Sequence, residues 1–260
     1  MSKKQPGNIR ITPASRFKKY KDILICKTTA DIKAEGQSTY FGYLWWILEP
    51  AMFFSVYYLL FGVILKSKAP DFIAFLLVGL ITWRWFLSSV NGAVSTIKRE
   101  SSLMQQVFIS KLVFPLTYVL AHAFRFIFVF ILLLIVMCIF KHFPNIHWLT
   151  LPLLLLTQLF LIIGLANCFA SITPFFPDLP KIIKNFTRVG LFLSGIFFDV
   201  SQVHGTLGTV LRLNPMADLI ISYRNVLINN TSPAWEGVAW AVLLGIIFNV
   251  IGFWIIIKNE

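Results

Sequence analysis

Charged side chains are scarce in this sequence, and acids are scarcer still. Of its 260 residues, 13% are charged and only 11 are Asp or Glu. Soluble domains carry about 25% charged residues, so most of this surface must face something other than water. The acids are scattered singly, whereas acid–base catalysis needs convergent carboxylates or a His–Asp pair. This scarcity counts against an integral-membrane glycosyltransferase or acyltransferase.

Metal-binding, disulfide and nucleotide-binding patterns are also missing. The three cysteines, Cys26, Cys138 and Cys168, have no ligand spacing, and two lie within apolar runs, which favours a packing role. His142 and His147 share one predicted loop with no carboxylate close in sequence, so we expect no metal site. No phosphate-binding G-x-x-x-x-G-K-[ST] loop occurs. Basic residues flank apolar runs instead of forming a stripe, which counts against nucleic acid.

Long apolar runs are abundant: 57% of the residues are hydrophobic, and the mean hydropathy is +0.77. A membrane-spanning helix needs roughly 20 mostly apolar residues. The sequence predicts an all-α integral membrane protein with six such helices, at 45–65, 72–94, 115–140, 148–172, 181–200 and 238–257. The segment 181–200 is the weakest, because its apolar part is short and Lys181, Lys184 and Arg188 share one helical face before it.

The 23 Lys and Arg residues predict the orientation, because cytosolic loops are enriched in them. Most lie on the side of the N-terminal tail, 1–44, so we expect a multi-pass protein of the bacterial inner membrane with both termini cytosolic. No cleavable signal peptide is predicted. Within the tail, Phe17, Tyr20 and Leu24 recur at helical spacing among lysines, which predicts an amphipathic helix along the cytosolic interface. The transmembrane domain is 45–257.

The stretch GYLWWILEP places an acid and a proline where the first span begins. Trp45 and Trp46 suit the headgroup layer. Glu49 is expected in the first helical turn, where the helix dipole favours an anion, and Pro50 near the start, where its missing N–H has no cost. A glutamate at membrane depth usually faces protein or water, which the capping interpretation leaves unexplained.

The segment 205–230 lies between the fifth and sixth predicted spans, on the outer side. Asn214 and Pro215 are a helix start signal, a capping side chain followed by the residue favoured at the first helical position. The following apolar helix is too short to cross a membrane and carries Asp218 and Arg224. It is either a re-entrant outer gate or an amphipathic helix resting on the membrane surface.

Seven motifs, in this order and spacing, resemble one transporter family. They are GYLWWILEP, VYYLLFGVILK, LLVGLITWRWF, LMQQVFISKLVFP, FFPDLPKIIKN, LSGIFF and LNPMADLIISYRNVLI. The sequence resembles the permease subunits of type-2 ABC exporters of cell-surface polysaccharides, over about 32–254. The resemblance implies a homodimer bound to two copies of a separate cytosolic ATPase, which would bind the ATP and Mg²⁺, so no cofactor is expected in this chain. It implies a polyprenyl-pyrophosphate-linked glycan as cargo, with O antigen preferred over capsule or teichoic acid. A passive channel or structural subunit is the other alternative.

The same resemblance implies where function resides. Candidate ATPase-coupling residues are Phe17, Tyr20, Leu24, Glu100, Met104 and Gln105. Candidate substrate-path residues are Phe53, Tyr57, Tyr58, Phe61, Trp83, Arg84, Trp85 and Arg125. Aromatic rings suit sugar C–H faces, and an arginine fork suits phosphate. Arg84 and Arg125 fall inside predicted spans, where an unpaired charge is costly. Each either guides pyrophosphate or pairs with Glu49 or with carbonyls across a dimer.

Overall fold

The computed structural model describes residues 13–37, 40–60, 71–102 and 110–258, with side chains from Lys21 onward. Within these ranges the structure is helical, with no strand. The long helices are α1 (Pro13–Gln37), α2 (Trp45–Tyr57), α3 (Phe72–Ala93), α6 (Val113–Ile139), α7 (Leu151–Ile172), α8 (Leu179–Leu193), α10 (Pro215–Leu227) and α11 (Trp235–Lys258). Shorter elements are η1 (Gly42–Leu44), α4 (Thr96–Arg99), η3 (Ile146–Thr150), η4 (Val200–Gln202) and α9 (Thr206–Arg212).

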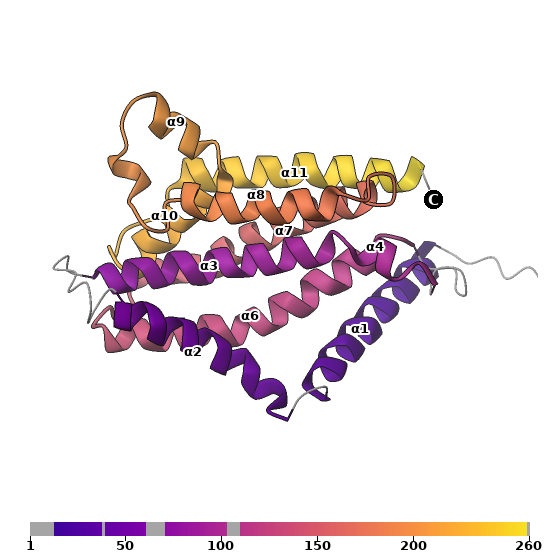
Figure 1. Ribbon diagram of the computed structural model, residues 1–260, viewed down its shortest axis with the longest axis horizontal. Coiled ribbons are helices and arrows are strands. Elements are labelled where there is room, and N and C mark those ends of the chain that lie inside the picture. Colours follow the sequence, from indigo (N-terminus) through magenta and orange to yellow (C-terminus); the bar gives the residue numbers. More distant parts are fainter. Residues whose placement is uncertain (1–12, 38–39, 61–70, 103–109, 259–260) are drawn as a thin grey trace, which may run out of the picture.

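The helices α3, α6, α7, α8 and α11 form an elongated bundle (Figure 1). The short α4 and the end of α11 lie at one end of the bundle, called here the α4 end, and α9 and α10 lie at the other, the α10 end. Helices α1 and α2 both pack against α6 and together form a V. The vertex of this V points away from the bundle. The tail helix α1 therefore packs on the transmembrane helices.

Small residues allow α7 and α11 to pack closely. A Cβ atom added at Gly164 of α7 would lie 2.8 Å from the Gly245 carbonyl oxygen of α11. One added at Gly252 of α11 would lie 2.7 Å from the Cys168 backbone nitrogen of α7. Close backbone approach at small residues is typical of packing between transmembrane helices, where no hydrophobic effect drives association.

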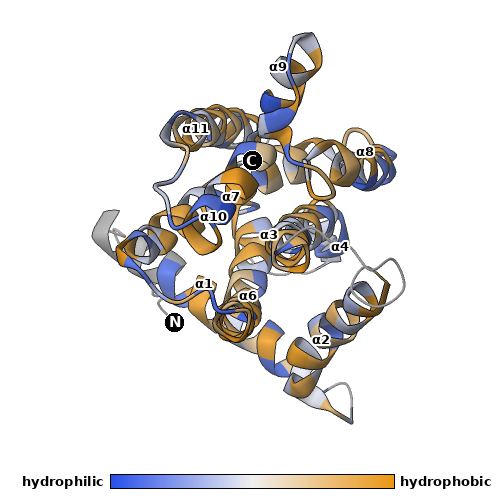
Figure 2. Cartoon of the chain, turned by 90° about the vertical axis from the view of Figure 1, so that its left-hand side faces the viewer, coloured by the Kyte–Doolittle hydropathy of each residue, from blue (hydrophilic) through white to orange (hydrophobic). Residues whose placement is uncertain are grey.

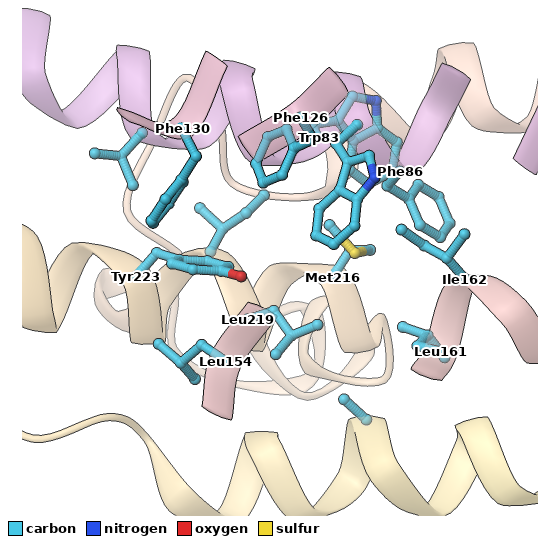
Figure 3. Close-up of a cluster of buried hydrophobic side chains, with 14 of the residues drawn as sticks. Trp83, Phe86, Phe126, Phe130, Leu154, Leu161, Ile162, Met216, Leu219 and Tyr223 are labelled. Carbon is cyan, nitrogen blue, oxygen red and sulfur yellow. The ribbon is translucent and has the colours of Figure 1, made fainter. Parts of the chain in front are cut away.

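The core joins the bundle to α10. Trp83 and Phe86 of α3 and Phe126 of α6 lie above Met216 and Leu219 of α10 in Figure 3, and all five are buried. Exposed apolar side chains lie along α2, α6, α8 and α11, and Figure 2 colours many residues of the outer helices as hydrophobic. This inverted surface is expected of a protein whose solvent is lipid.

Five helices in the described ranges are long and apolar enough to cross a membrane: Gly42–Leu60, Phe72–Ala93, Val113–Ile139, Ile146–Ile172 and Trp235–Lys258. They coincide with five of the predicted spans, although 61–65 lies outside the described residues. The predicted span 181–200 is shorter than expected, because α8 ends at Leu193 after 15 residues. At 1.5 Å per residue it is roughly 22 Å long, less than the hydrocarbon core of about 30 Å. The six-span count stays a prediction.

The predicted start of the first span was wrong, and the start of α8 lacks a side-chain cap. The turn η1 runs directly into α2 at Trp45, so Glu49 lies beyond the first turn and Pro50 is inside the helix. Asp178 does occupy the N-cap position of α8, but its side chain makes no capping bond and lies 3.6 Å from Lys181 instead. Glu49 therefore needs another partner, and the structure supplies one.

Candidate functional site

A cavity of about 560 Å³ lies between α2, α3 and α6, with single residues from α1 and α8 at its edge. We call it the α2 cavity. Six predicted substrate-path residues line it: Phe53, Tyr57, Trp83, Arg84, Trp85 and Arg125. Residues from three predicted spans thus meet in one space, although α2 is separated from α6 by more than fifty residues in sequence.

Arg84 lines the cavity from the middle of α3 and forms an ion pair with Glu49 of α2. Its guanidinium carbon also lies 4.1 Å from the ring centroid of Phe53, one turn along α2. Pairing with Glu49 was one of the alternatives that the sequence left open for Arg84, and the structure contains this pair. It also explains the retained glutamate, because a carboxylate at membrane depth needs a charged partner.

Arg125, near the middle of α6, forms the second ion pair of the cavity, with Glu35 of α1. Sequence reasoning missed Glu35. It is the last acid before the first predicted span, close to the end of an amphipathic helix, and this position could have suggested it. Together the two pairs hold both arms of the α1–α2 V against the bundle. The cavity therefore contains two arginines, each neutralised by a glutamate that comes from the V.

The aromatic part of the cavity comes mainly from α3. Trp83 and Trp85 are 3% and 5% exposed, and Trp85 stacks on Phe126 of α6 at a centroid distance of 4.2 Å. Neither indole N–H has a hydrogen-bond partner among the described residues. A buried donor without a partner is costly, and a polar ligand in the cavity could accept such a bond.

One predicted path residue does not join this wall. Tyr58 continues past the end of α2, is exposed and contacts Phe54 at a centroid distance of 6.1 Å. Phe61 lies outside the described residues. Of the path residues predicted in the first span, Phe53 and Tyr57 line the α2 cavity.

The predicted coupling elements meet at the α4 end. Lys27 of α1 lies 3.7 Å from the carboxylate of Glu100, which follows α4, and 5.7 Å from the ring centroid of Phe114. Leu24 lines an apolar groove of about 850 Å³ between α1, α2 and α6. The side chains of Phe17 and Tyr20, and the residues Met104 and Gln105, lie outside the described part of the chain.

The predicted start of α10 is confirmed. Asn214 is the N-cap residue, and its side-chain oxygen accepts a hydrogen bond from the Met216 N–H at 3.1 Å, while Pro215 occupies the first helical position. The Asn214 amide also donates to the Ser194 hydroxyl at 2.7 Å. Most of α10 is buried against α3, α7 and α11. An amphipathic helix resting on a surface would leave one face free, so the structure disfavours that alternative.

Arg224 explains how a charged residue of α10 is accommodated in the core. It is 4% exposed, and its guanidinium donates three hydrogen bonds to backbone carbonyls. Nε donates to Phe75 at 3.1 Å, Nη1 to Gly195 at 2.7 Å and Nη2 to Ile196 at 3.0 Å. The planar fork of arginine suits several fixed acceptors at once. One side chain thus links α10 to α3 and to the turn after α8.

Asp218, the other charged residue predicted for this segment, is 8% exposed and lies close to α11. A Cβ atom added at Gly237 would fall 2.9 Å from its Oδ2 atom. Burial raises the pKa of the Asp218 carboxyl; the charge of Arg212 opposes the rise and that of Glu236 adds to it. Asp218 therefore contacts α11 through a carboxyl that is harder to ionise than usual.

Sequence comparisons agree with this arrangement. The ABC-2 type transporter family matches residues 28–228. An O-antigen export system permease protein of Klebsiella pneumoniae is 24% identical over 232 residues, 89% of each chain. The corresponding protein of Myxococcus xanthus is 29% identical over 219 residues, 84% of each chain. A polysialic acid transport protein of Escherichia coli is 30% identical over 186 residues, 69% of this chain and 70% of that one. Because the family match covers most of its length, this chain belongs to the ABC-2 type transporter family.

Proposed function

We propose that this chain is the membrane permease subunit of an ATP-driven ABC transporter that exports a lipid-linked polysaccharide, O antigen in the first instance, across the bacterial inner membrane. The proposal rests on the family match over residues 28–228. Similar proteins named for O-antigen export, which align over most of both chains, support it. The polysialic acid transport protein, aligned over 186 residues, makes a capsule polysaccharide the second candidate cargo.

The α2 cavity supports a cargo that is both anionic and sugar-bearing. Two arginines offer planar forks for a diphosphate, and Trp85 and Phe53 offer rings for sugar C–H faces. Glu49 and Glu35 neutralise Arg84 and Arg125. The diphosphate of an arriving glycolipid would compete with these carboxylates for the same guanidinium groups. Loading would then loosen the hold of the α1–α2 V on α3 and α6.

Energy is proposed to come from two copies of a separate cytosolic ATPase. The surface formed by α1 and α4 supports this division, because the Lys27–Glu100 contact joins the tail helix to the first loop. A push on either element would be transmitted along α1 to Glu35 and so to the α2 cavity. We infer that Glu100, Met104 and Gln105 contact the ATPase.

We further propose a homodimer of six-span protomers, with both termini cytosolic and α10 re-entrant from the outer side. Helix α2 has no buried residue in the isolated chain, so the α2 cavity is well placed to be closed by a second protomer. The burial of α10 among α3, α7 and α11 supports the re-entrant position, because backbone at membrane depth survives only when protein or a water-filled cavity surrounds it.

Complementation tests the proposal. The permease gene is deleted from its own strain, and surface polysaccharide is measured by immunoblot after re-expression of wild-type chain or the Glu100→Arg variant. Wild-type chain should restore the polysaccharide and co-purify with an ABC ATPase of the same strain. Glu100→Arg should reach the membrane in normal amounts yet lose both. Asp178→Arg, an exposed charge reversal on α8, is the matched control. Normal surface polysaccharide in the deletion strain would overturn the proposed function.

A further inference from the structure

A histidine lines the part of the α2 cavity that is nearest to the α4 end. His122 is the first residue of α6 to line the cavity, one helical turn before Arg125. Residues three apart on a helix lie on the same face. The imidazole and the Arg125 guanidinium therefore border the same space, and the imidazole is the one closer to the α4 end.

The His122 side chain is positioned by a ring contact. Its centroid lies 4.4 Å from that of Tyr118, one turn earlier on α6. The Tyr118 ring in turn lies over Gly92 of α3, where a Cβ atom would overlap it. Neither imidazole nitrogen forms a hydrogen bond with another residue in the described part of the chain. A histidine within a membrane-spanning helix faces a partner or a cavity, so both nitrogens are available to a ligand in the α2 cavity.

The α3 wall opposite His122 is also polar. Helices α3 and α6 lie side by side and run in opposite directions (Figure 1), with Trp85 stacked on Phe126 at a centroid distance of 4.2 Å. One turn along α3 from this stack is Ser88, at the level of His122, and both residues line the cavity. The Ser88 hydroxyl donates to the Trp85 carbonyl at 3.2 Å and keeps a lone pair for another donor.

These groups suit a sugar better than a phosphate. A neutral imidazole presents one donor and one acceptor, and a serine hydroxyl can act as either. Sugar hydroxyls also donate and accept, so they can satisfy both imidazole nitrogens. The oxygens of an ionised phosphate only accept, and the planar forks of the two arginines already match them. The α2 cavity therefore has a part suited to a diphosphate and, next to it, a part suited to hydroxyl groups.

The order of these two parts matches the order of groups in a lipid-linked glycan. In such a molecule the first sugar is joined directly to the diphosphate, and before export the glycan extends from it on the cytosolic side. The α4 end is cytosolic in the proposed orientation, and His122 lies one turn closer to that end than Arg125 does. A diphosphate held at Arg125 would thus place the first sugar beside His122.

We propose that His122 recognises the sugar joined directly to the diphosphate, through hydrogen bonds to its hydroxyl groups, with Ser88 as a second contact. This inference rests on the proposed function, because it needs a diphosphate-linked glycan at Arg125. The permease then selects its cargo by the first sugar and not by the repeating unit of the polymer. A pocket that hydrogen-bonds a hydroxyl group discriminates against ligands that lack it, because its own polar groups would stay unpaired.

Equilibrium binding to the purified full-length chain in detergent, by titration calorimetry, tests this role. The probes are farnesyl diphosphate and its conjugates with glucose, galactose, N-acetylglucosamine and N-acetylgalactosamine. At least one sugar should raise the affinity about fivefold or more over farnesyl diphosphate. In His122→Phe, which keeps a ring against Tyr118, this preference should fall to about twofold or less, while farnesyl diphosphate itself binds as in wild type. His147→Phe, in η3, is the matched control and should keep the preference.

A measurement on the wild-type chain covers the case in which His122→Phe does not fold. Diethyl pyrocarbonate acylates accessible imidazoles, and mass spectrometry of peptides reads each histidine separately. The preferred sugar conjugate should slow acylation of His122 more strongly than farnesyl diphosphate does, and should leave His147 unaffected.

The outcomes separate this inference from the proposed function. Equal affinity for all probes in wild type, an unchanged preference in His122→Phe, or equal protection of His122 by farnesyl diphosphate would overturn the role of His122 and leave the diphosphate site standing. Failure of every prenyl diphosphate to bind the wild-type chain would contradict the proposed cargo site as well.

Discussion

Arg224 contacts Phe75 twice: its Nε donates to the Phe75 carbonyl at 3.1 Å, and its guanidinium carbon lies 3.3 Å from the centroid of the Phe75 ring. The remaining donors go to the carbonyls of Gly195 and Ile196. Three parts of the chain, separated by up to 149 positions, therefore meet at one buried side chain. This contact fixes α10 relative to α3 and makes the stability of the outer segment testable.

Replacing Arg224 by lysine should destabilise the protein. A lysine ammonium keeps the charge but cannot reach all three carbonyls in one plane, so at least one carbonyl loses its partner in a buried position. We expect a loss of about 2–4 kcal/mol, measured as a lower midpoint of denaturant unfolding. Arg212→Lys, on α9, is the control and should change the midpoint little. An unchanged midpoint in Arg224→Lys would show that the three bonds contribute nothing.

Gly79→Ala should weaken the same contact from the other side. A Cβ atom at Gly79 would lie 2.8 Å from Arg224 Nη2, so the guanidinium must move away from its carbonyl partners. Residues that share one network couple non-additively. The double variant Gly79→Ala, Arg224→Lys should therefore lose less stability than the sum of the single variants. Strict additivity in a double-mutant cycle would contradict the proposed displacement.

Substitutions at Arg84 separate a substrate role from a structural one. Arg84→Gln should reduce polysaccharide export at least tenfold, while Arg84→Lys should retain much of it, because a phosphate is attracted by either charge. The swapped variant Arg84→Glu, Glu49→Arg restores an ion pair between α2 and α3 but reverses its direction. If Arg84 binds cargo, the swap should recover thermal stability without recovering export. Export at the wild-type level in the swapped variant would assign the pair a purely structural role.

Asp218→Asn should stabilise the protein more at neutral than at acidic pH. The raised pKa of Asp218 means that the folded state holds this proton more tightly than the unfolded state. The stability from the neutral carboxyl is full below the unfolded pKa, about 3.9, and is lost as pH rises through the folded value. Asparagine does not titrate, so the Tm of the variant should exceed wild type increasingly from about pH 4 to 7. A constant difference across this range would contradict the assignment.

Most of the fold followed from patterns local in sequence. Apolar runs located five helices that are long and apolar enough to span a membrane, because a helix in lipid must satisfy its backbone internally and must cover about 30 Å. Asn214 and Pro215 fixed the start of α10 through a cap that acts within three residues. The predicted end of the 181–200 helix was wrong, because α8 ends at Leu193, and so was the predicted place of Glu49, because η1 runs directly into α2. In both cases the geometry of a turn, which composition does not encode, decided the boundary.

The site was less predictable because its contacts are non-local. Arg84 and Arg125 were recognised as unusual from their place within spans, since a buried charge needs a partner. Glu35 was missed: its place as the last acid before the first predicted span marks it as a candidate, but its partner on the middle of α6 depends on how α1 folds back. Arg224 was recognised as a charge in a segment that is either a re-entrant outer gate or an interfacial helix, but its three carbonyl partners could not be predicted. Sequence identifies residues that need partners, and only the packing says which partners they find.

Transport in reconstituted vesicles tests the central claim most directly. The permease, together with the ABC ATPase that co-purifies with it, is reconstituted into liposomes that carry a fluorescent lipid-linked polysaccharide on the ATPase-accessible leaflet. Transfer is read as protection from a membrane-impermeant quencher. We predict that ATP produces protection, and that a non-hydrolysable ATP analogue or Arg84→Gln permease produces little. Protection that develops equally without ATP, or none despite ATP hydrolysis by the assembled complex, would contradict the account.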